Sequence, residues 1–254
     1  MKCSMDKLRK AGIVAVLSLI LPIPGVSLSD PTAKSILERA DEVRNPESDY
    51  TVDVTVTSEK PGKEPKTARY EVLIKGKTKT VIKTLAPAVD RGTSMLMVDY
   101  DFWVFLPTIS KPLRISLQQR LLGEVANGDI ARANFSGDYS PTLLRNESIN
   151  VKEYYVLELI AKDDRVTYHR VLLWVEKDNF HPLKAEFYAV SDRLLKKASY
   201  EEYRRIAGKM RPSRLVLDDP LVCGQRSIIE YSDVAAQKLP DRYFTKQHLK
   251  KLKY

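Results

Sequence analysis

The chain has 254 residues, of which 43% are hydrophobic and 30% charged, and its formal net charge is +9. This apolar content excludes a disordered chain, and a count of 2 cysteines excludes a disulfide-rich scaffold or a cysteine-based zinc module. With only 3 histidines, scattered along the sequence, we predict no metal site and no cofactor. The length allows one domain with its own hydrophobic core.

The first 29 residues have the segment order of a secretory signal peptide. Basic residues between Lys2 and Lys10 precede an apolar run, Ala11–Leu21, and small residues follow at Ser27 and Ser29. The run is shorter than the roughly 20 residues that a membrane helix needs. We predict a signal peptide over residues 1–29, a mature domain over residues 30–254 and a periplasmic location. The alternative is an N-terminal membrane anchor.

A helix is predicted at the start of the mature domain. Asp30 suits the N-cap position and Pro31 the first turn, and apolar residues then recur at helical spacing until Asn45-Pro46. From Tyr50 onward the apolar residues alternate with polar ones, which is typical of half-buried strands. Turn signals divide this part of the chain into eleven predicted strands: 50–57, 70–74, 80–85, 95–100, 102–106, 153–160, 168–176, 182–190, 197–203, 209–217 and 225–231.

The alternation is interrupted between residues 117 and 144. Apolar side chains there return to helical spacing, and we predict a helical lid built on Leu117, Leu121, Leu122, Val125, Ile130 and Phe135. A single sheet of about eleven strands must curl, and a curled sheet with one apolar face forms a concave surface. We therefore predict a mainly β (α+β) fold in which a helix and a lid cover a hydrophobic concavity.

The ligand cavity is expected to be lined by apolar residues of the strands. Each of them has an alternative interpretation as ordinary core, because every strand must bury one face. The candidates are Val52, Val54, Val56, Tyr70, Val72, Met95, Met97, Trp103, Phe105, Tyr155, Leu157, Trp174 and Phe187.

Catalytic and nucleotide-binding motifs are absent from the sequence: it contains no G-x-S-x-G, no phosphate loop, no G-x-G-x-x-G and no H-E-x-x-H. We predict that the protein is not an enzyme. Its positive charge is too diffuse to indicate nucleic acid, but it favours transient contact with anionic lipid headgroups or an acidic partner.

Several stretches, in order, resemble the outer-membrane lipoprotein-sorting proteins of the LolA/LolB-like superfamily, closest to an exporter-associated branch. They extend over about residues 31–252: Leu85-Ala86-Pro87 with Arg91-Gly92-Thr93, Phe102–Pro107, Arg114-Ile115-Ser116, Phe135–Ser140, Leu173–Glu176, His181–Lys184, and Leu239-Pro240 through Phe244-Thr245 to Leu249. The order Ser136-Gly137-Asp138-Tyr139 departs from the branch's usual Gly-Ser-Asp-Phe type of run.

The resemblance implies an unclosed antiparallel barrel with helical lids around a hydrophobic cavity. It also implies a carrier that shelters the acyl chains of a lipoprotein or lipid between membranes, with an inner-membrane exporter, of the RND type, as partner. An alternative is a ligand-sensing or interaction module of the envelope. A cavity arginine locks the lid in known carriers; Arg69 is a candidate by position, with a solvated strand residue as the alternative, and Asp138 is a second lid-locking candidate.

Overall fold

The computed structural model describes residues 31–249 except 47, 110 and 133. These residues form one sheet of 13 antiparallel strands, to which a two-stranded hairpin, β7–β8, is added. The strands are β1 Tyr50–Lys60, β2 Lys63–Lys75, β3 Lys79–Ala86, β4 Ser94–Val98, β5 Asp101–Phe105, β6 Leu113–Ile115, β7 Arg120–Leu122, β8 Val125–Ala126, β9 Tyr139–Ile149, β10 Lys152–Ala161, β11 Arg170–Glu176, β12 Pro182–Tyr188, β13 Leu194–Ile206, β14 Lys209–Asp218 and β15 Arg226–Ala236.

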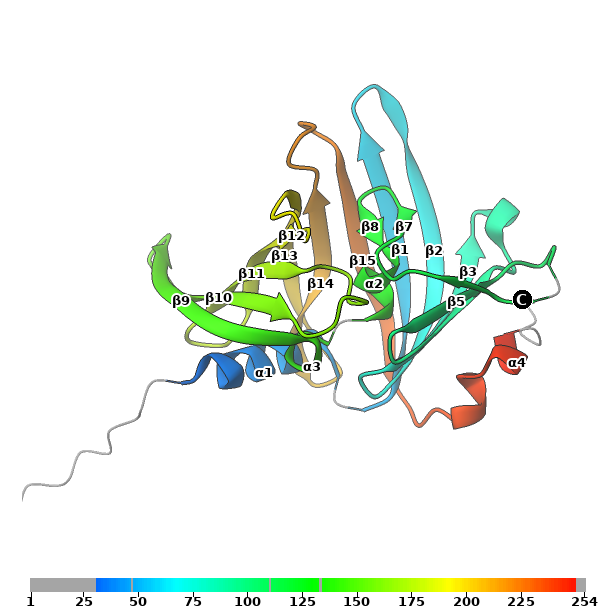
Figure 1. Cartoon of the computed structure of the whole chain (residues 1–254), viewed down its shortest axis with the longest axis horizontal. Helices are drawn as coiled ribbons and strands as arrows, with labels where there is room; N and C mark the ends of the chain where they lie inside the picture. Colours follow the sequence, from blue (N-terminus) through cyan, green and yellow to red (C-terminus); the bar gives the residue numbers. More distant parts are fainter. Residues whose placement is uncertain (1–30, 47, 110, 133, 250–254) are drawn as a thin grey trace, which may run out of the picture. The chain divides into compact units, whose positions relative to one another are not determined.

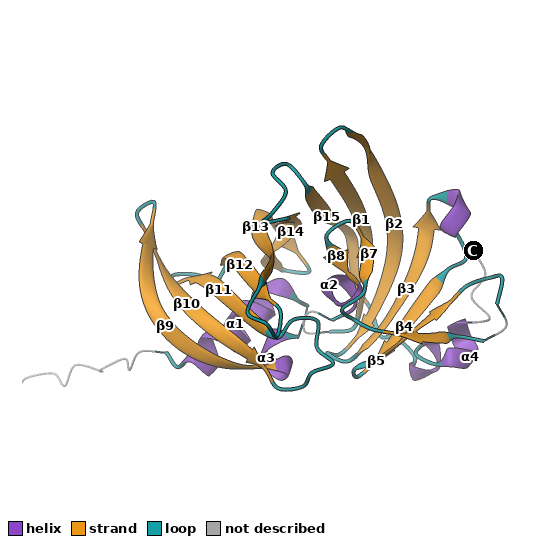
Figure 2. Ribbon diagram, turned by 45° about the horizontal axis from the view of Figure 1, so that its top comes forward, coloured by secondary structure: helices purple, strands orange, loops and turns teal. Residues whose placement is uncertain are grey.

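Two meanders make up the sheet. One runs from β1 out to β6, and the other returns from β9 to β15, so that β1 and β15 pair in the middle. The edge strands β6 and β9 do not pair with each other, so the sheet is unclosed, and it curves visibly in Figures 1 and 2. Irregularities in register, such as the one between Thr51 and Asp53, increase the local twist.

The chain between β6 and β9 must pass from one edge of the sheet to the other. This crossover segment, residues 116–138, contains the β7–β8 hairpin and the short helices α2 (Asn127–Ala131) and α3 (Phe135–Asp138). It packs on the same face as helix α1 (Ala33–Arg44), because Ile36, Val125 and Ile130 belong to one buried cluster. The topology thus places a covering segment over the concave face.

The helix predicted at the start of the domain is α1, but it begins later than expected. Thr32 is its N-cap, and the hydroxyl oxygen of Thr32 accepts a hydrogen bond from the backbone N–H of Ser35. The predicted cap, Asp30, and the predicted signal peptide lie outside the described residues. Helix α1 ends at Arg44, and Asn45 is its C-cap, so the helix stops at Asn45-Pro46 as predicted.

The two faces of the sheet are both partly covered. The large cluster lies on the concave face, whereas Leu73, Val81 and Leu96 form a second cluster on the opposite face. Residues of the C-terminal segment, with η2 (Asp241–Tyr243) and α4 (Lys246–Leu249), cover that second cluster. A single turn of 3-10 helix, η1 (Ala88–Asp90), follows β3. A third, small apolar cluster contains Tyr154, Val156 and Trp174.

The eleven predicted strands correspond to β1–β5 and β10–β15. The prediction was wrong for β6, β7, β8 and β9, which were assigned to loops or to the lid. In particular, the leucines around Leu121 do not form a helix, because the chain reverses at Gly123, whose φ is +57°. The fold class, a mainly β unclosed antiparallel sheet with few helices, is confirmed.

A glycine is needed at position 123 for a steric reason as well as for its φ. A Cβ atom there would lie 2.3 Å from the hydroxyl of Ser58 and 2.4 Å from that of Ser227. We expect Gly123→Ala to lower the free energy of unfolding by about 1–3 kcal/mol, measured by urea denaturation. Gly62→Ala is the matched control, because Gly62 also has a positive φ (+69°) but no atom within 4 Å of its Cβ position. Equal effects of the two changes would contradict the packing of the hairpin on the sheet.

Candidate ligand cavity

A cavity of about 90 Å³ lies between the concave face of the sheet and the end of α1. Three of the predicted cavity residues, Val52, Val54 and Val72, line it. Its other apolar lining residues come from β2, α2, β13, β14, β15 and the chain just after α1, namely Ile74, Ile130, Ile206, Pro212, Leu215, Val234 and Pro46. The wall is therefore built from strands far apart in sequence and from the crossover segment.

A second cavity of about 290 Å³ adjoins the first. It shares Asn45, Pro46, Tyr50, Ile74 and Ile130 with it. Its remaining lining residues come from α1, the β2–β3 turn, β3 and the crossover segment: Glu38, Asp41, Glu42, Gly76, Lys77, Thr80, Ala131 and Asn134. Four of these side chains are charged. An apolar interior is thus joined to a polar space along α1.

Of the remaining predicted cavity residues, seven lie in or against the large cluster, and three lie on the opposite face of the sheet. Buried in the large cluster, but away from these two cavities, are Val56, Tyr70, Met95, Met97, Leu157 and Phe187, with Tyr155 half-buried against it. Met95 lines a separate, open groove of about 490 Å³ together with Leu121.

Trp103, Phe105 and Trp174 were predicted on the wrong face. Trp103 and Phe105 pack against the C-terminal segment, and Trp174 belongs to the small cluster around Tyr154. Because side chains alternate along a strand, these residues point away from the face that their neighbours in the large cluster share.

The six residues predicted to form the lid lie in or against the large cluster. Leu117, Val125, Ile130 and Phe135 are buried in the large cluster, and Leu121 and Leu122 pack against it half-buried. Their secondary structure, a hairpin followed by two short helices, differs from the predicted helix.

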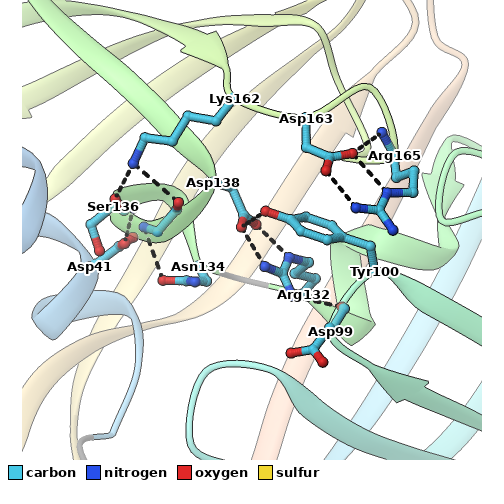
Figure 3. Close-up of polar contacts among 11 residues, drawn as sticks. Asp41, Asp99, Tyr100, Arg132, Asn134, Ser136, Asp138, Lys162, Asp163 and Arg165 are labelled. Carbon is cyan, nitrogen blue, oxygen red and sulfur yellow. Dashed lines mark hydrogen bonds and ion pairs between the residues drawn. The ribbon is translucent and has the colours of Figure 1, made fainter.

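Two residues of α1 that form a buried ion pair with each other also contact the crossover segment. The Arg44 guanidinium lies 2.9 Å from the Asp41 carboxylate and 3.9 Å from the centre of the Phe135 ring. The other carboxylate oxygen of Asp41 accepts a hydrogen bond from the backbone N–H of Ser136 at 2.6 Å (Figure 3). Burial raises the pKa of Asp41, and the Arg44 charge opposes that rise.

A second buried pair holds the far end of the crossover segment. Arg132 and Asp138 have side chains only 5% and 4% exposed, and the Arg132 Nε donates to Asp138 at 2.6 Å. Arg132 also donates to the backbone carbonyl of Asp99 at 2.7 Å, and the Tyr100 hydroxyl donates to Asp138 at 3.2 Å (Figure 3). These contacts tie the segment to the β4–β5 turn.

A third buried pair holds the middle of the segment. Lys196 on β13 contacts the Asp129 carboxylate and donates to the backbone carbonyl of Glu124 at 2.9 Å. Asp129 also accepts from the Tyr168 hydroxyl at 2.8 Å and from the backbone N–H of Ala126 at 2.7 Å. Burial lowers the pKa of Lys196, and the Asp129 charge opposes that shift.

The two lid-locking candidates lie in different surroundings, one exposed and one buried. Arg69 is not in the cavity: its side chain is 58% exposed and lies 3.9 Å from Asp53, because its neighbours Ala68 and Tyr70 take the inward positions. The solvated alternative is therefore the observed one. Asp138 is buried in contact with Arg132. Arg132 itself was missed, although it is an isolated charge among small and apolar residues.

Within the ranges that the structure describes, no helix is long and apolar enough to cross a membrane. The same ranges contain no group of three or more His, Cys, Asp or Glu side chains that could hold a metal ion.

Known structures share this architecture. A LolA superfamily protein from Nitrosomonas europaea is 51% identical, with 86% of this chain and 99% of that chain covered and a TM-score of 0.83. A DUF1329 family protein from Desulfovibrio piger is 26% identical, with coverage of 85% and 97% and a TM-score of 0.74. For a putative outer membrane lipoprotein-sorting protein domain from Vibrio parahaemolyticus the identity is 24%, the coverage 86% and 98%, and the TM-score 0.71.

A family model described as "Uncharacterized protein" matches residues 76–251. The search of curated proteins found no match. The predicted resemblance is confirmed by the 51% identity over nearly the full length of the Nitrosomonas europaea protein. The chain belongs to the LolA superfamily.

Proposed function

We propose that the protein is a periplasmic carrier that shelters the acyl chains of a lipoprotein or lipid during transfer between the membranes of the envelope. The observation that carries this proposal is the apolar cavity between the curved sheet and the crossover segment. Burying one CH₂ group is worth about 0.8 kcal/mol, so an acyl chain crossing an aqueous compartment gains several kcal/mol from such a shelter.

Loading and release require the crossover segment to move, since Ile130 on α2 lines both cavities. Besides its apolar packing, the segment is held by charged contacts through Asp41, Arg132 and Lys196, and its hairpin β7–β8 does not join the strand ladder of the large sheet. Such contacts have two discrete states, made or broken, as a lid requires.

The related structures support the same proposal. The Vibrio parahaemolyticus structure of the same fold is described as a putative outer membrane lipoprotein-sorting protein domain. The signal-like order of residues 1–29 supports export to the periplasm, and an inner-membrane exporter, of the RND type, is the partner that would supply the cargo. No catalytic role is part of the proposal.

Filling the cavity should reduce ligand binding. Val234 is a half-buried residue of the cavity wall, and we expect Val234→Phe to weaken the binding of a fluorescent fatty-acyl probe about tenfold or more, because overpacking costs about 1–3 kcal/mol. The measurement is a fluorescence titration. Val98→Phe is the matched control, because Val98 is half-buried in the cluster on the opposite face. Equal affinities in both variants would place the ligand elsewhere.

Trimming the crossover segment should shorten ligand retention. We expect Leu121→Ala, Leu122→Ala and Val125→Ala each to raise the dissociation rate of the same probe about threefold or more, because each change removes apolar contacts that hold the segment on the interior. Stopped-flow competition gives the rate. Leu144→Ala, at an exposed leucine of β9, serves as the control. Unchanged rates in all three variants would contradict the lid role of the segment.

A further inference from the structure

The C-terminal segment after β15 lies across the outer face of the sheet, opposite the concave face (Figure 1). Its residues Leu239, Phe244 and Leu249 are buried in the cluster that β2, β3 and β4 form on that face. Because these apolar side chains turn toward the sheet, the charged residues between them are exposed.

Two lysines that flank the β2–β3 turn hold this segment in place. The Lys75 ammonium donates to the backbone carbonyl of Leu239 at 2.7 Å and lies 3.2 Å from the Asp241 carboxylate. The Lys79 ammonium lies 2.9 Å from the same carboxylate. These contacts place the first part of the segment beside the β2–β3 turn.

Positive charge is in excess on this part of the surface. Asp241 is shared by two lysines, and Lys238, Arg242 and Lys246 form no ion pair with any described residue. The Lys246 ammonium instead lies 4.0 Å from the centre of the Trp103 ring. A ring face attracts a cation but does not neutralise it, so these three charges are available to an anionic partner.

Aromatic side chains accompany these cations. Trp103 of β5 and Tyr243 of η2 are half-buried at the edge of the outer cluster, and the Arg242 guanidinium lies 5.6 Å from the centre of the Tyr243 ring. Half-buried aromatic rings beside lysines and arginines are typical of surfaces that meet a membrane, where the rings reach the headgroup level and the cations meet phosphates. Together the five residues Lys238, Arg242, Lys246, Trp103 and Tyr243 form the C-terminal basic surface.

The β2–β3 turn joins this surface to the second cavity. Gly76 and Lys77 in the turn line that cavity, whereas Lys75 and Lys79 on either side of them contact the C-terminal segment. A membrane docked on the C-terminal basic surface would therefore lie next to the polar cavity along α1. This position favours a bilayer over an acidic protein as the partner, because the proposed cargo has to pass between the cavity and a membrane.

We infer that the C-terminal basic surface docks the protein on a bilayer that contains anionic phospholipids, with Lys238, Arg242 and Lys246 next to the headgroup phosphates. The inference rests on the proposed function and adds the place where the carrier meets a membrane. Attraction between such cations and an anionic membrane is short-ranged and screened by salt, so the binding should weaken as the salt concentration is raised.

Flotation of the full chain with lipid vesicles tests this surface. Vesicles of phosphatidylcholine alone are compared with vesicles that also contain phosphatidylglycerol, at low and at physiological salt. We expect the wild type to float with the anionic vesicles only, and less so at the higher salt. Lys238→Gln/Arg242→Gln/Lys246→Gln should bind the anionic vesicles about tenfold or more weakly, because each cation next to the membrane contributes to the affinity.

The triple variant Lys60→Gln/Lys63→Gln/Lys66→Gln is the matched control. It removes the same net charge from three exposed lysines of the β1–β2 hairpin, at the other end of β2, which also form no ion pair with described residues. We expect its affinity for the anionic vesicles to stay within about threefold of the wild type. Neither variant changes a residue that lines the two cavities, so both should stay folded in urea denaturation and keep the binding of a fluorescent acyl probe.

Other outcomes overturn the inference or the carrier function separately. Failure of the wild type to bind either kind of vesicle, equal binding to both kinds, or equal losses in the two triple variants would each overturn the inference. If the wild type binds poly-L-glutamate but no vesicle, and the C-terminal variant loses that binding, the surface takes an acidic protein and the membrane assignment is wrong. If the vesicles behave as expected but the wild type binds no acyl probe, the carrier function fails while the membrane surface stands.

Discussion

Replacing Arg132 with methionine is expected to lower the free energy of unfolding by about 3–5 kcal/mol. The change leaves the Asp138 carboxylate buried, with the Tyr100 hydroxyl as its remaining hydrogen-bond donor from a side chain. It also removes the hydrogen bond to the Asp99 carbonyl, which holds the crossover segment on the β4–β5 turn. Urea denaturation measures the change, and the same variant should release a bound acyl probe faster.

A double variant separates the loss of the pair from the loss of packing. Arg132→Met/Asp138→Leu removes both charges, and we expect it to recover a large part of the stability, because no buried charge is left without a partner. Arg114→Met, at a mostly exposed arginine of β6 that contacts Asp101, should change the stability by less than about 0.5 kcal/mol. If Arg132→Met is as mild as this control, the buried contact does not hold the segment.

Replacing Lys196 with methionine should have an effect of similar size, about 3–5 kcal/mol. Its ammonium group is the cation in contact with the buried Asp129 carboxylate, and it also donates to the Glu124 carbonyl in the β7–β8 hairpin. Without it, the donors that Asp129 keeps among the described residues are neutral, namely the Tyr168 hydroxyl and the Ala126 backbone N–H. Thermal and urea unfolding of the two proteins give the difference.

The neighbouring residue provides the control for Lys196. Lys197 points to the opposite face of β13, where its exposed side chain lies 3.7 Å from Glu186. Lys197→Met is therefore expected to change the free energy of unfolding by less than about 0.5 kcal/mol. A loss of stability of the same size in both variants would show that the contact of Lys196 with Asp129 is not the cause.

Strands with regular alternation could be predicted from the sequence, whereas edge strands could not. In β1, Val52, Val54 and Val56 face the interior, and the polar residues between them mark the other face. In β9, most side chains are exposed on both faces, so Leu143-Leu144 gives no period of two. An edge strand in this position is held by backbone pairing with β10 rather than by a buried face, and the sequence carries no signal of that.

The sequence also did not show which face of the sheet an apolar strand residue occupies. Strand β5 is apolar on both sides, since Phe102 enters the large cluster and Trp103 packs against the C-terminal segment. Alternation shows that the two residues lie on different faces, but not which face is concave. The sequence cannot reveal that residues beyond Leu239 return to cover the outer face, because this contact depends on tertiary packing.

The polar contacts of the crossover segment were the least predictable feature. Asp138 was a candidate because of its motif, but its partner Arg132 and the pair of Lys196 with Asp129 depend on how β13 and the segment meet in space. The position of Arg69 in the second strand gave no such information, because alternation turns it outward.

Native mass spectrometry with lipid extraction shows whether the cavity holds an acyl chain. The full-length chain is expressed and isolated from the periplasmic fraction, beside the Val234→Phe variant. We expect a species carrying an acyl chain to co-purify with the wild type and to be reduced or lost in the variant. A folded wild-type protein that is empty, and that also fails to bind a hydrophobic probe, would contradict it.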